Sequence, residues 1–243
     1  MFLKWVTCSV AEASREAFGS AQQGWSAIVG QPGLVGQVGG WDTATGDAHI
    51  LGLWTDRGSY GLFMRDRHDV VANQSGQAQT YRGVHVSVGD AVFTIDGDAP
   101  RLPDALAGGV LLRVADCRVD AARRAHFVGE QRDVWAPGMA AAGGMLGGVF
   151  TQLAACRYLV TTLWSDAAAH QRYASEDVPR LRDLAAADDD LTSLVGRVLL
   201  LEPRWKVIAA HRTVLNTTLH NDSPTPSSTD HGRAPVWVSP CDS

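Results

Sequence analysis

The sequence lacks the features that several large classes of protein require. Its 243 residues carry a formal net charge of −5 and only scattered basic residues, so no surface for nucleic acid is indicated. No apolar run approaches the roughly 20 residues that cross a bilayer. The four cysteines show no C-x-x-C spacing, which excludes the usual zinc and disulfide scaffolds. The first residues resemble a strand and not a signal peptide, so we expect a cytoplasmic protein without a membrane partner.

The remaining composition is that of an ordinary globular protein. Hydrophobic residues make up 45% of the chain and charged residues 19%. A chain of 243 residues has room for two domains of common size, each with its own core.

An internal repeat is the strongest feature of the sequence. Residues 33–38 (GLVGQV) resemble residues 144–149 (GMLGGV), and residues 53–56 (LWTD) resemble residues 163–166 (LWSD). Both pairs are separated by about 110 residues, in the same order along the chain, which indicates a duplicated unit. Single residues at similar offsets also match: Lys4, Cys8, Val10, Phe18 and Trp25 in the first copy, and Arg113, Cys117, Val119, Phe127 and Trp135 in the second.

Each copy predicts the same order of elements, βαββαβ. Apolar and β-branched runs predict strands, helical spacing of apolar residues predicts helices, and turn-forming residues separate them. In the first copy we expect strands at 2–10, 33–41, 47–55 and 83–95, with helices at 12–30 and 58–73. The second copy repeats this order over 109–209, with helices near 120–142 and 166–187.

The predicted organisation is therefore an α+β fold of two tandem ferredoxin-like modules. We name residues 1–95 module one and residues 109–210 module two; a linker at 96–108 and a tail at 211–243 complete the chain. A four-stranded sheet with helices on one face must cover its other face. We expect the two sheets to close face to face into an intrachain barrel around a shared pocket, giving a monomer or a loose homodimer.

Several motifs resemble a known family. The chain is similar to the YdbC-like proteins of the dimeric α+β barrel superfamily, which includes antibiotic-biosynthesis monooxygenases. The resemblance is specific over residues 1–95 and rests on four motifs: Lys4-Trp5, Phe18-x-x-x-Gln22-x-x-Trp25, Gly36-Gln37-x-Gly39-Gly40-Trp41 and Phe63-Met64-x-x-x-His68-Asp69.

The resemblance implies a small-molecule substrate but not one reaction. The superfamily includes cofactor-free monooxygenases, haem proteins, isomerases, cyclases and stress proteins, and fold alone does not choose among them. Our leading hypothesis is a cofactor-free oxygenation, or an acid/base isomerisation or cyclisation, of an aromatic or polyketide-like metabolite. Two alternatives stay open, a haem-binding or haem-degrading protein and a non-enzymatic ligand-binding stress or sensor protein.

His68 and Asp69 are the candidate catalytic residues. Imidazole exchanges protons near neutral pH, which suits acid/base chemistry. Adjacent helical residues point about 100° apart, so Asp69 need not contact His68, and a surface pair is the structural alternative. The order of Trp54 and then a helix bearing His68 also resembles the haem-degrading members, although the spacing is longer here.

The candidate substrate-binding residues are polar or aromatic. A buried amide in an apolar strand, such as Gln37, needs a partner or a ligand. Flat aromatic walls suit a planar ligand, although such rings also fill cores. The candidate set is Gln22, Trp25, Gln37, Trp41, Tyr81 and His85. No motif for a metal is present, so no metal is expected.

The two copies differ at these positions. His68 maps to Val178, Gln37 to Gly148 and Trp41 to Gln152. We therefore expect one functional pocket, lined mainly by module one, with module two as the wall that closes it.

Overall fold

The computed structural model describes residues 1–209, so the predicted tail at 211–243 lies outside the described residues. Module one has the predicted βαββαβ order. Its strands are β1 (Phe2–Ser9), β2 (Leu34–Asp42), β3 (Ala48–Trp54) and β4 (Gly83–Ile95). Its helical segments are η1 (Glu12–Ser14), α1 (Arg15–Gln23), η2 (Gly24–Ile28), α2 (Arg57–Phe63), η3 (Met64–His68), α3 (Asp69–Ser75) and η4 (Gln77–Gln79).

Module two repeats this order. Its strands are β5 (Leu111–Val119), β6 (Met145–Ala154), β7 (Arg157–Trp164) and β8 (Leu191–Leu201). Its helical segments are α5 (Arg124–Glu130), η5 (Gln131–Trp135), α6 (Ala136–Ala140), α7 (Ala167–Arg172), η6 (Tyr173–Asp177), α8 (Val178–Leu184) and α9 (Ala187–Asp190). A short extension, η7 (Pro203–Trp205) and β9 (Val207–Ile208), then returns to module one, where β9 pairs with β2.

The two sheets join edge to edge into a closed eight-stranded antiparallel barrel, which confirms the predicted fold class. Strand β4 pairs with β6, and β8 pairs with β2, so each module hydrogen-bonds to the other at two seams. The seam at β2 requires glycine, because a Cβ atom at Gly40 would lie 2.0 Å from the carbonyl oxygen of Leu200. Close approach of the two backbones therefore explains the glycine at this position.

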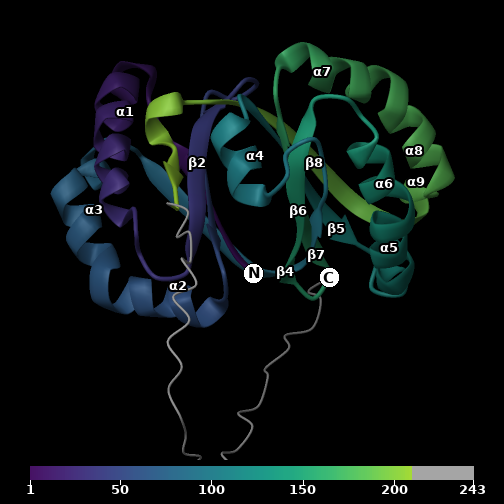
Figure 1. Cartoon of the computed structure of the whole chain (residues 1–243), viewed down its shortest axis with the longest axis horizontal. Coiled ribbons are helices and arrows are strands. Elements are labelled where there is room, and N and C mark those ends of the chain that lie inside the picture. The colour runs from purple at the N-terminus through teal and green to yellow at the C-terminus, as the bar shows by residue number, and fades with distance from the viewer. Residues whose placement is uncertain (210–243) are drawn as a thin grey trace, which may run out of the picture.

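The interior of the barrel is a packed apolar core. Alternate residues of every strand point inward, and they meet in one cluster that includes Leu3, Trp5, Leu51, Leu112 and Leu163. Helices lie outside the barrel, with α1–α3 covering module one and α5–α8 covering module two (Figure 1).

One helix was missed by the sequence analysis. Residues 96–108, predicted as a linker, contain helix α4 (Leu102–Gly108). Its proline lies in the first turn, where a missing N–H costs no hydrogen bond. Ala105 and Leu106 are fully buried in the barrel core, so tertiary packing holds a helix that the Asp, Gly and Pro composition had disfavoured.

Candidate functional site

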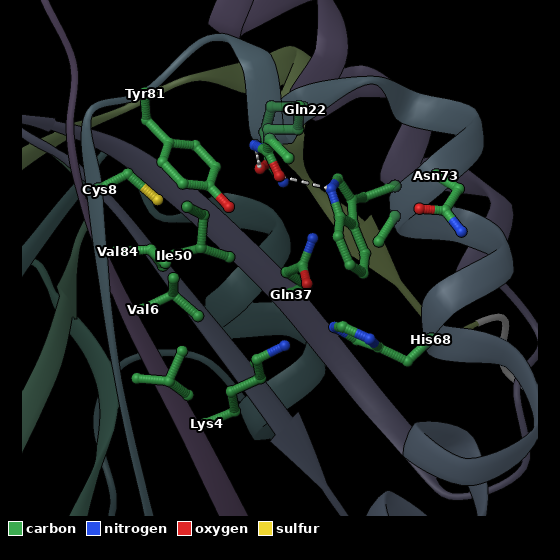
Figure 2. Close-up of a pocket in the computed structure, with 16 residues that line it drawn as sticks. Lys4, Val6, Cys8, Gln22, Gln37, Ile50, His68, Asn73, Tyr81 and Val84 are labelled. Carbon is green, nitrogen blue, oxygen red and sulfur yellow. Dashed lines mark hydrogen bonds between the residues drawn. The ribbon is translucent and has the colours of Figure 1, made fainter.

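A cavity of about 230 Å³ lies in module one, between the helices and the outer face of the sheet (Figure 2). Lys4, Val6 and Cys8 of β1 face it, while the alternating residues Leu3 and Trp5 face the barrel core. The lining residues all belong to module one: Lys4, Val6, Cys8, Gln22, Trp25, Gln37, Ile50, Gly52, His68, Ala72, Asn73, Gln77, Ala78, Tyr81, Val84 and Val86.

The position of this cavity differs from the expected one. We expected a pocket shared by the two sheets inside the barrel, closed by module two. The barrel interior is instead filled by side chains such as Leu51, Leu112 and Leu163, and no residue of module two lines the cavity. The cavity is thus lined by module one, as the prediction of a module-one pocket requires, whereas the predicted wall from module two is not present in it.

The floor of the cavity is apolar and reaches solvent at one side. Val84 and Val86 of β4 are 50% and 48% exposed, although both are valines on the helix-covered face of the sheet. They stand beside Cys8 and Val6 of the neighbouring strand. An apolar floor with an open edge suits a flat, partly apolar ligand entering along β4.

Lys4 was not among the predicted site residues. Its ammonium group lies 5.5 Å from the centre of the Trp25 ring and points into the cavity (Figure 2). Within residues 1–209 it has no ion pair or hydrogen bond. Burial lowers the pKa of Lys4 to about 8, with the Cys8 thiol opposing that shift. A lysine in an otherwise apolar strand was the available sequence signal.

His68 and Asp69 are in direct contact through their side chains. His68 Nδ1 lies 2.9 Å from Asp69 Oδ1. The His68 side chain is only 22% exposed and lies against Trp25 and Phe63, whereas the Asp69 side chain is 90% exposed and outside the cavity. Asp69 therefore holds the ring from the solvent side, and the Nε2 edge of the imidazole is directed to the cavity.

A buried chain of amides fixes the Trp25 wall. The Trp25 indole N–H donates to Gln77 Oε1 at 2.8 Å, and Gln77 Nε2 donates to Gln22 Oε1. Gln22 thus supports the cavity through Gln77, a residue that the sequence analysis missed. Asn73 of α3 completes this side and was also missed.

Gln37 and Tyr81 line the cavity as predicted. Gln37 is 7% exposed, so its side chain is buried at the cavity and does not face solvent. Its Nε2 atom is buried and has no hydrogen-bond partner within the described part of the chain. Tyr81 lies at the other end of the cavity, with its hydroxyl group turned inward (Figure 2). Burial raises the pKa of the Tyr81 phenol, so it is a neutral hydrogen-bonding group.

Two predicted residues lie elsewhere. Trp41 packs against Phe18 and Trp205, and its indole N–H donates to Glu202 at 3.2 Å. His85 alternates with the floor valines along β4, so its side chain points away from the cavity, and its Nε2 lies 3.1 Å from Ser87 Oγ. The sequence pattern identified both as polar or aromatic but could not assign their faces.

The cysteines of β1 and β5 have no reactive character. Cys8 and Cys117 are buried, and burial raises the pKa of each thiol to about 12. Within residues 1–209, no three His, Cys, Asp or Glu side chains lie together as metal ligands, and no helix is long and apolar enough to cross a membrane.

Two βαββαβ modules closed into one antiparallel barrel, with an open cavity under the helices, define the dimeric α+β barrel class. A candidate monooxygenase from Lactobacillus acidophilus NCFM shares this fold, with a TM-score of 0.66 and 14% identity over 85% of this chain and 95% of its own. An anthrone oxidase-like protein shares it with a TM-score of 0.61 and 10% identity over 83% of this chain and 91% of its own. These likenesses establish the fold.

The family follows from sequence. Residues 2–88 match the family described as domain of unknown function DUF4937. Over 91 residues the chain is 32% identical to the uncharacterized protein YdbC of Bacillus subtilis (strain 168), a match that covers 36% of this chain and 76% of the relative. The chain belongs to this YdbC family. The family match, residues 2–88, lies within module one, the module that holds the cavity.

A haem, which the fold family makes conceivable, does not fit the cavity. His68 offers a ligand atom, but the macrocycle is much larger than a space of about 230 Å³. The Trp25 wall cannot move aside without breaking its hydrogen bond to the buried Gln77.

Proposed function

We propose that this chain is a small-molecule enzyme and that His68 is its acid/base group. The observation that carries the proposal is the placement of one imidazole, held by Asp69 at 2.9 Å, at the edge of a cavity that also contains an unpaired lysine and an unpaired amide. Titratable groups gathered in a concave apolar site are the usual mark of an active site.

The cavity supports a compact, planar substrate with an ionisable hydroxyl group. Trp25 offers a flat face, and the valines of β1 and β4 offer an apolar floor. A volume of about 230 Å³ lies below the ~300–1,000 Å³ of typical drug-sized sites, which favours one or two rings. A phenol or enol of this size is our proposed substrate class.

Proton removal from that hydroxyl group is the step that the residues support. His68 Nε2 accepts the proton while Asp69 stabilises the imidazolium that forms. Lys4, when protonated, and the Gln37 amide face the resulting oxyanion in a low-dielectric site. The same step begins an oxygenation without a bound cofactor, an isomerisation and a cyclisation, so the proposal covers all three reactions.

A screen of hydroxylated aromatic compounds tests this proposal. Binding is measured by isothermal titration calorimetry, and conversion by mass spectrometry of the products in the presence of oxygen. We expect His68→Ala to lower turnover about 10²–10⁴-fold, the usual contribution of a general acid/base. The matched control is His85→Ala, because His85 points away from the cavity.

Two results would contradict the proposal. One is equal turnover by the His68→Ala variant and the unmodified chain. The other is tight binding without conversion of any compound, which would identify a non-enzymatic ligand-binding protein.

A further inference from the structure

Lysine is rare in this chain, and one of the two lysines lies in the cavity. The sequence contains only Lys4 and Lys206, against a combined lysine and arginine count of 21. Lys206 is occupied, because its ammonium group donates to the carbonyl oxygens of Ala107 and Gly109 at 2.7 and 2.6 Å. Lys4 has no such partner within residues 1–209.

Module two has an arginine, Arg113, at the position that matches Lys4. Lys4 pairs with Gly52 across β1 and β3, and Arg113 pairs with Thr162 across β5 and β7 in the same way. Arg113 lies 5.9 Å from the centre of the Tyr173 ring. An arginine stays charged, whereas a buried lysine can lose its proton and become a nucleophile.

The surroundings of Lys4 raise the share of its neutral amine. Among residues 1–209 no carboxylate pairs with its ammonium group, and burial lowers its pKa to about 8. Relative to an ordinary lysine with a pKa of 10.5, this gives roughly 300-fold more neutral amine at pH 7.

A second polar group in the cavity, the Gln37 amide, also lacks a hydrogen-bond partner among residues 1–209. The Gln37 side chain is 7% exposed, and its buried Nε2 donor makes no hydrogen bond to residues 1–209. Figure 2 shows this amide, the Lys4 amine and the His68 ring around the same space. A buried donor without an acceptor is costly unless a ligand supplies the acceptor.

We propose that Lys4 forms a Schiff base with an aldehyde or ketone group of the ligand, whose carbonyl oxygen accepts a hydrogen bond from Gln37. This deepens the proposed function, on which it rests, by adding a carbonyl group to the phenolic or enolic substrate.

The step balances without an oxidant or a reductant. The Lys4 Nζ lone pair attacks the carbonyl carbon, and one proton passes from the nitrogen to the oxygen to give a neutral carbinolamine. His68, as its imidazolium, then protonates the hydroxyl group, which leaves as water while the C=N bond forms. The imidazole, now neutral, takes the remaining proton from the nitrogen, so His68 ends the step protonated as it began. Amine and carbonyl thus become imine and water, and hydrolysis reverses the step and releases the product.

Reductive trapping tests the proposal directly. The full chain is incubated with 4-hydroxybenzaldehyde and sodium cyanoborohydride, which reduces an imine to a stable secondary amine. Peptide mapping then has only three amines to distinguish, Lys4, Lys206 and the amino group of Met1. We expect labelling of Lys4 at least ~10-fold faster than labelling of Lys206, because the Lys206 ammonium group is held by two carbonyl oxygens and burial lowers the pKa of Lys4 to about 8.

The matched variants are Lys4→Arg, which installs the residue found in module two, and Lys206→Arg. The first should abolish the fast adduct and the second should leave it unchanged. Circular dichroism and a melting curve establish that each variant is folded, and Lys4→Met serves if Lys4→Arg is not.

Equal labelling of the two lysines, or a fast adduct that survives in Lys4→Arg, would overturn the Schiff base. If phenols without a carbonyl group are still bound and turned over in a His68-dependent manner, the acid/base proposal stands without it. If neither labelling of Lys4 nor turnover occurs, both proposals fail.

Discussion

The two modules have the same framework of strands, helices and ring contacts, but they differ in the space between the helices and the sheet. In module one, the Trp54 ring lies 5.9 Å from that of Tyr60 and 4.9 Å from that of Phe63. In module two, Trp164 repeats this arrangement with His170 and Tyr173, at 5.3 and 5.0 Å. The framework of the two modules is therefore the same, including the aromatic contacts around Trp54 and Trp164.

The helices repeat in the same detail. Asp56 and Asp166 each cap a helix by accepting a backbone N–H three residues on, and each helix then continues through a five-residue π-helical segment, η3 or η6. A π-helical segment often marks a functional site. Both modules have such a segment after this helix, so the segment itself does not distinguish them. They differ at His68 of module one and Val178, its counterpart in module two.

The space itself is open in one module and filled in the other. Phe150 of module two is fully buried and stacks on Tyr158 at 5.3 Å. Module one has Gly39 at the matching position, and the Trp205 ring packs over it, outside the cavity. Val178 replaces His68 and packs on the module-two core. The comparison teaches that one copy of a duplicated fold can keep an open site while the other is devoted to packing.

Trp164→Ala tests the packing role of module two and has the largest expected effect. The Trp164 side chain is fully buried, and its indole N–H donates to Thr162 at 3.0 Å. Truncation should lower the free energy of unfolding by about 3–5 kcal/mol, which denaturant titration measures. The control is His68→Ala, which removes a partly exposed side chain and should shift the melting temperature by a few degrees at most. If both variants lost the same free energy of unfolding, the assignment of a binding role to module one and a packing role to module two would be wrong.

Most of the frame was predictable from the sequence. Strand β4 (Gly83–Ile95) has the ends that its alternation predicted, and the repeat predicted the order of strands and helices that module two has. These predictions succeeded because alternation and turn residues are local signals. Helix α4 was missed because it is stabilised by Ala105 and Leu106 in the barrel core, which no local pattern reveals.

The candidate site was predictable only in part. His68 and Gln37 were found because polar residues stand out in apolar elements, and both line the cavity. Trp41 and His85 were misplaced because which face of a strand is covered depends on the register and on distant helices. Lys4 was overlooked because its lack of a counter-charge is a property of the folded chain.

Lys4→Met should stabilise the protein, as expected if Lys4 serves the site in module one and not the packing of the fold. Burial depresses the pKa of Lys4 from 10.5 to about 8, so folding disfavours its charged form. The destabilisation is fully present below pH 8, shrinks between pH 8 and 10.5, and is absent above pH 10.5. We expect Lys4→Met to gain up to about 3 kcal/mol at pH 7 and markedly less at pH 10, measured by urea denaturation.

The pH dependence distinguishes this explanation from simple packing. A gain of the same size at both pH values would mean that methionine only fills space better. No gain at pH 7 would mean that the charge of Lys4 is compensated. A stabilising change that abolishes ligand binding would instead be the stability–activity trade-off expected of a functional residue.

Gly52→Thr is the finest test of the comparison, because it installs the residue that module two has at the matching position. Gly52 pairs with Lys4 and Gln37 across the sheet, and Thr162 occupies the same place in module two, opposite Arg113 and Gly148. A Cβ atom at Gly52 would lie 3.8 Å or more from its nearest neighbours, which is an ordinary contact. Threonine also favours strands, so the free energy of unfolding should change by less than about 1 kcal/mol.

The added side chain nevertheless projects into the cavity beside Lys4 and Gln37. We therefore expect about a tenfold loss of affinity for a phenolic ligand by calorimetry, equivalent to about 1.4 kcal/mol, with an unchanged melting temperature. Unchanged affinity in a folded Gly52→Thr variant would show that the ligand does not occupy this part of the cavity, and that the difference between the modules at this position concerns packing alone.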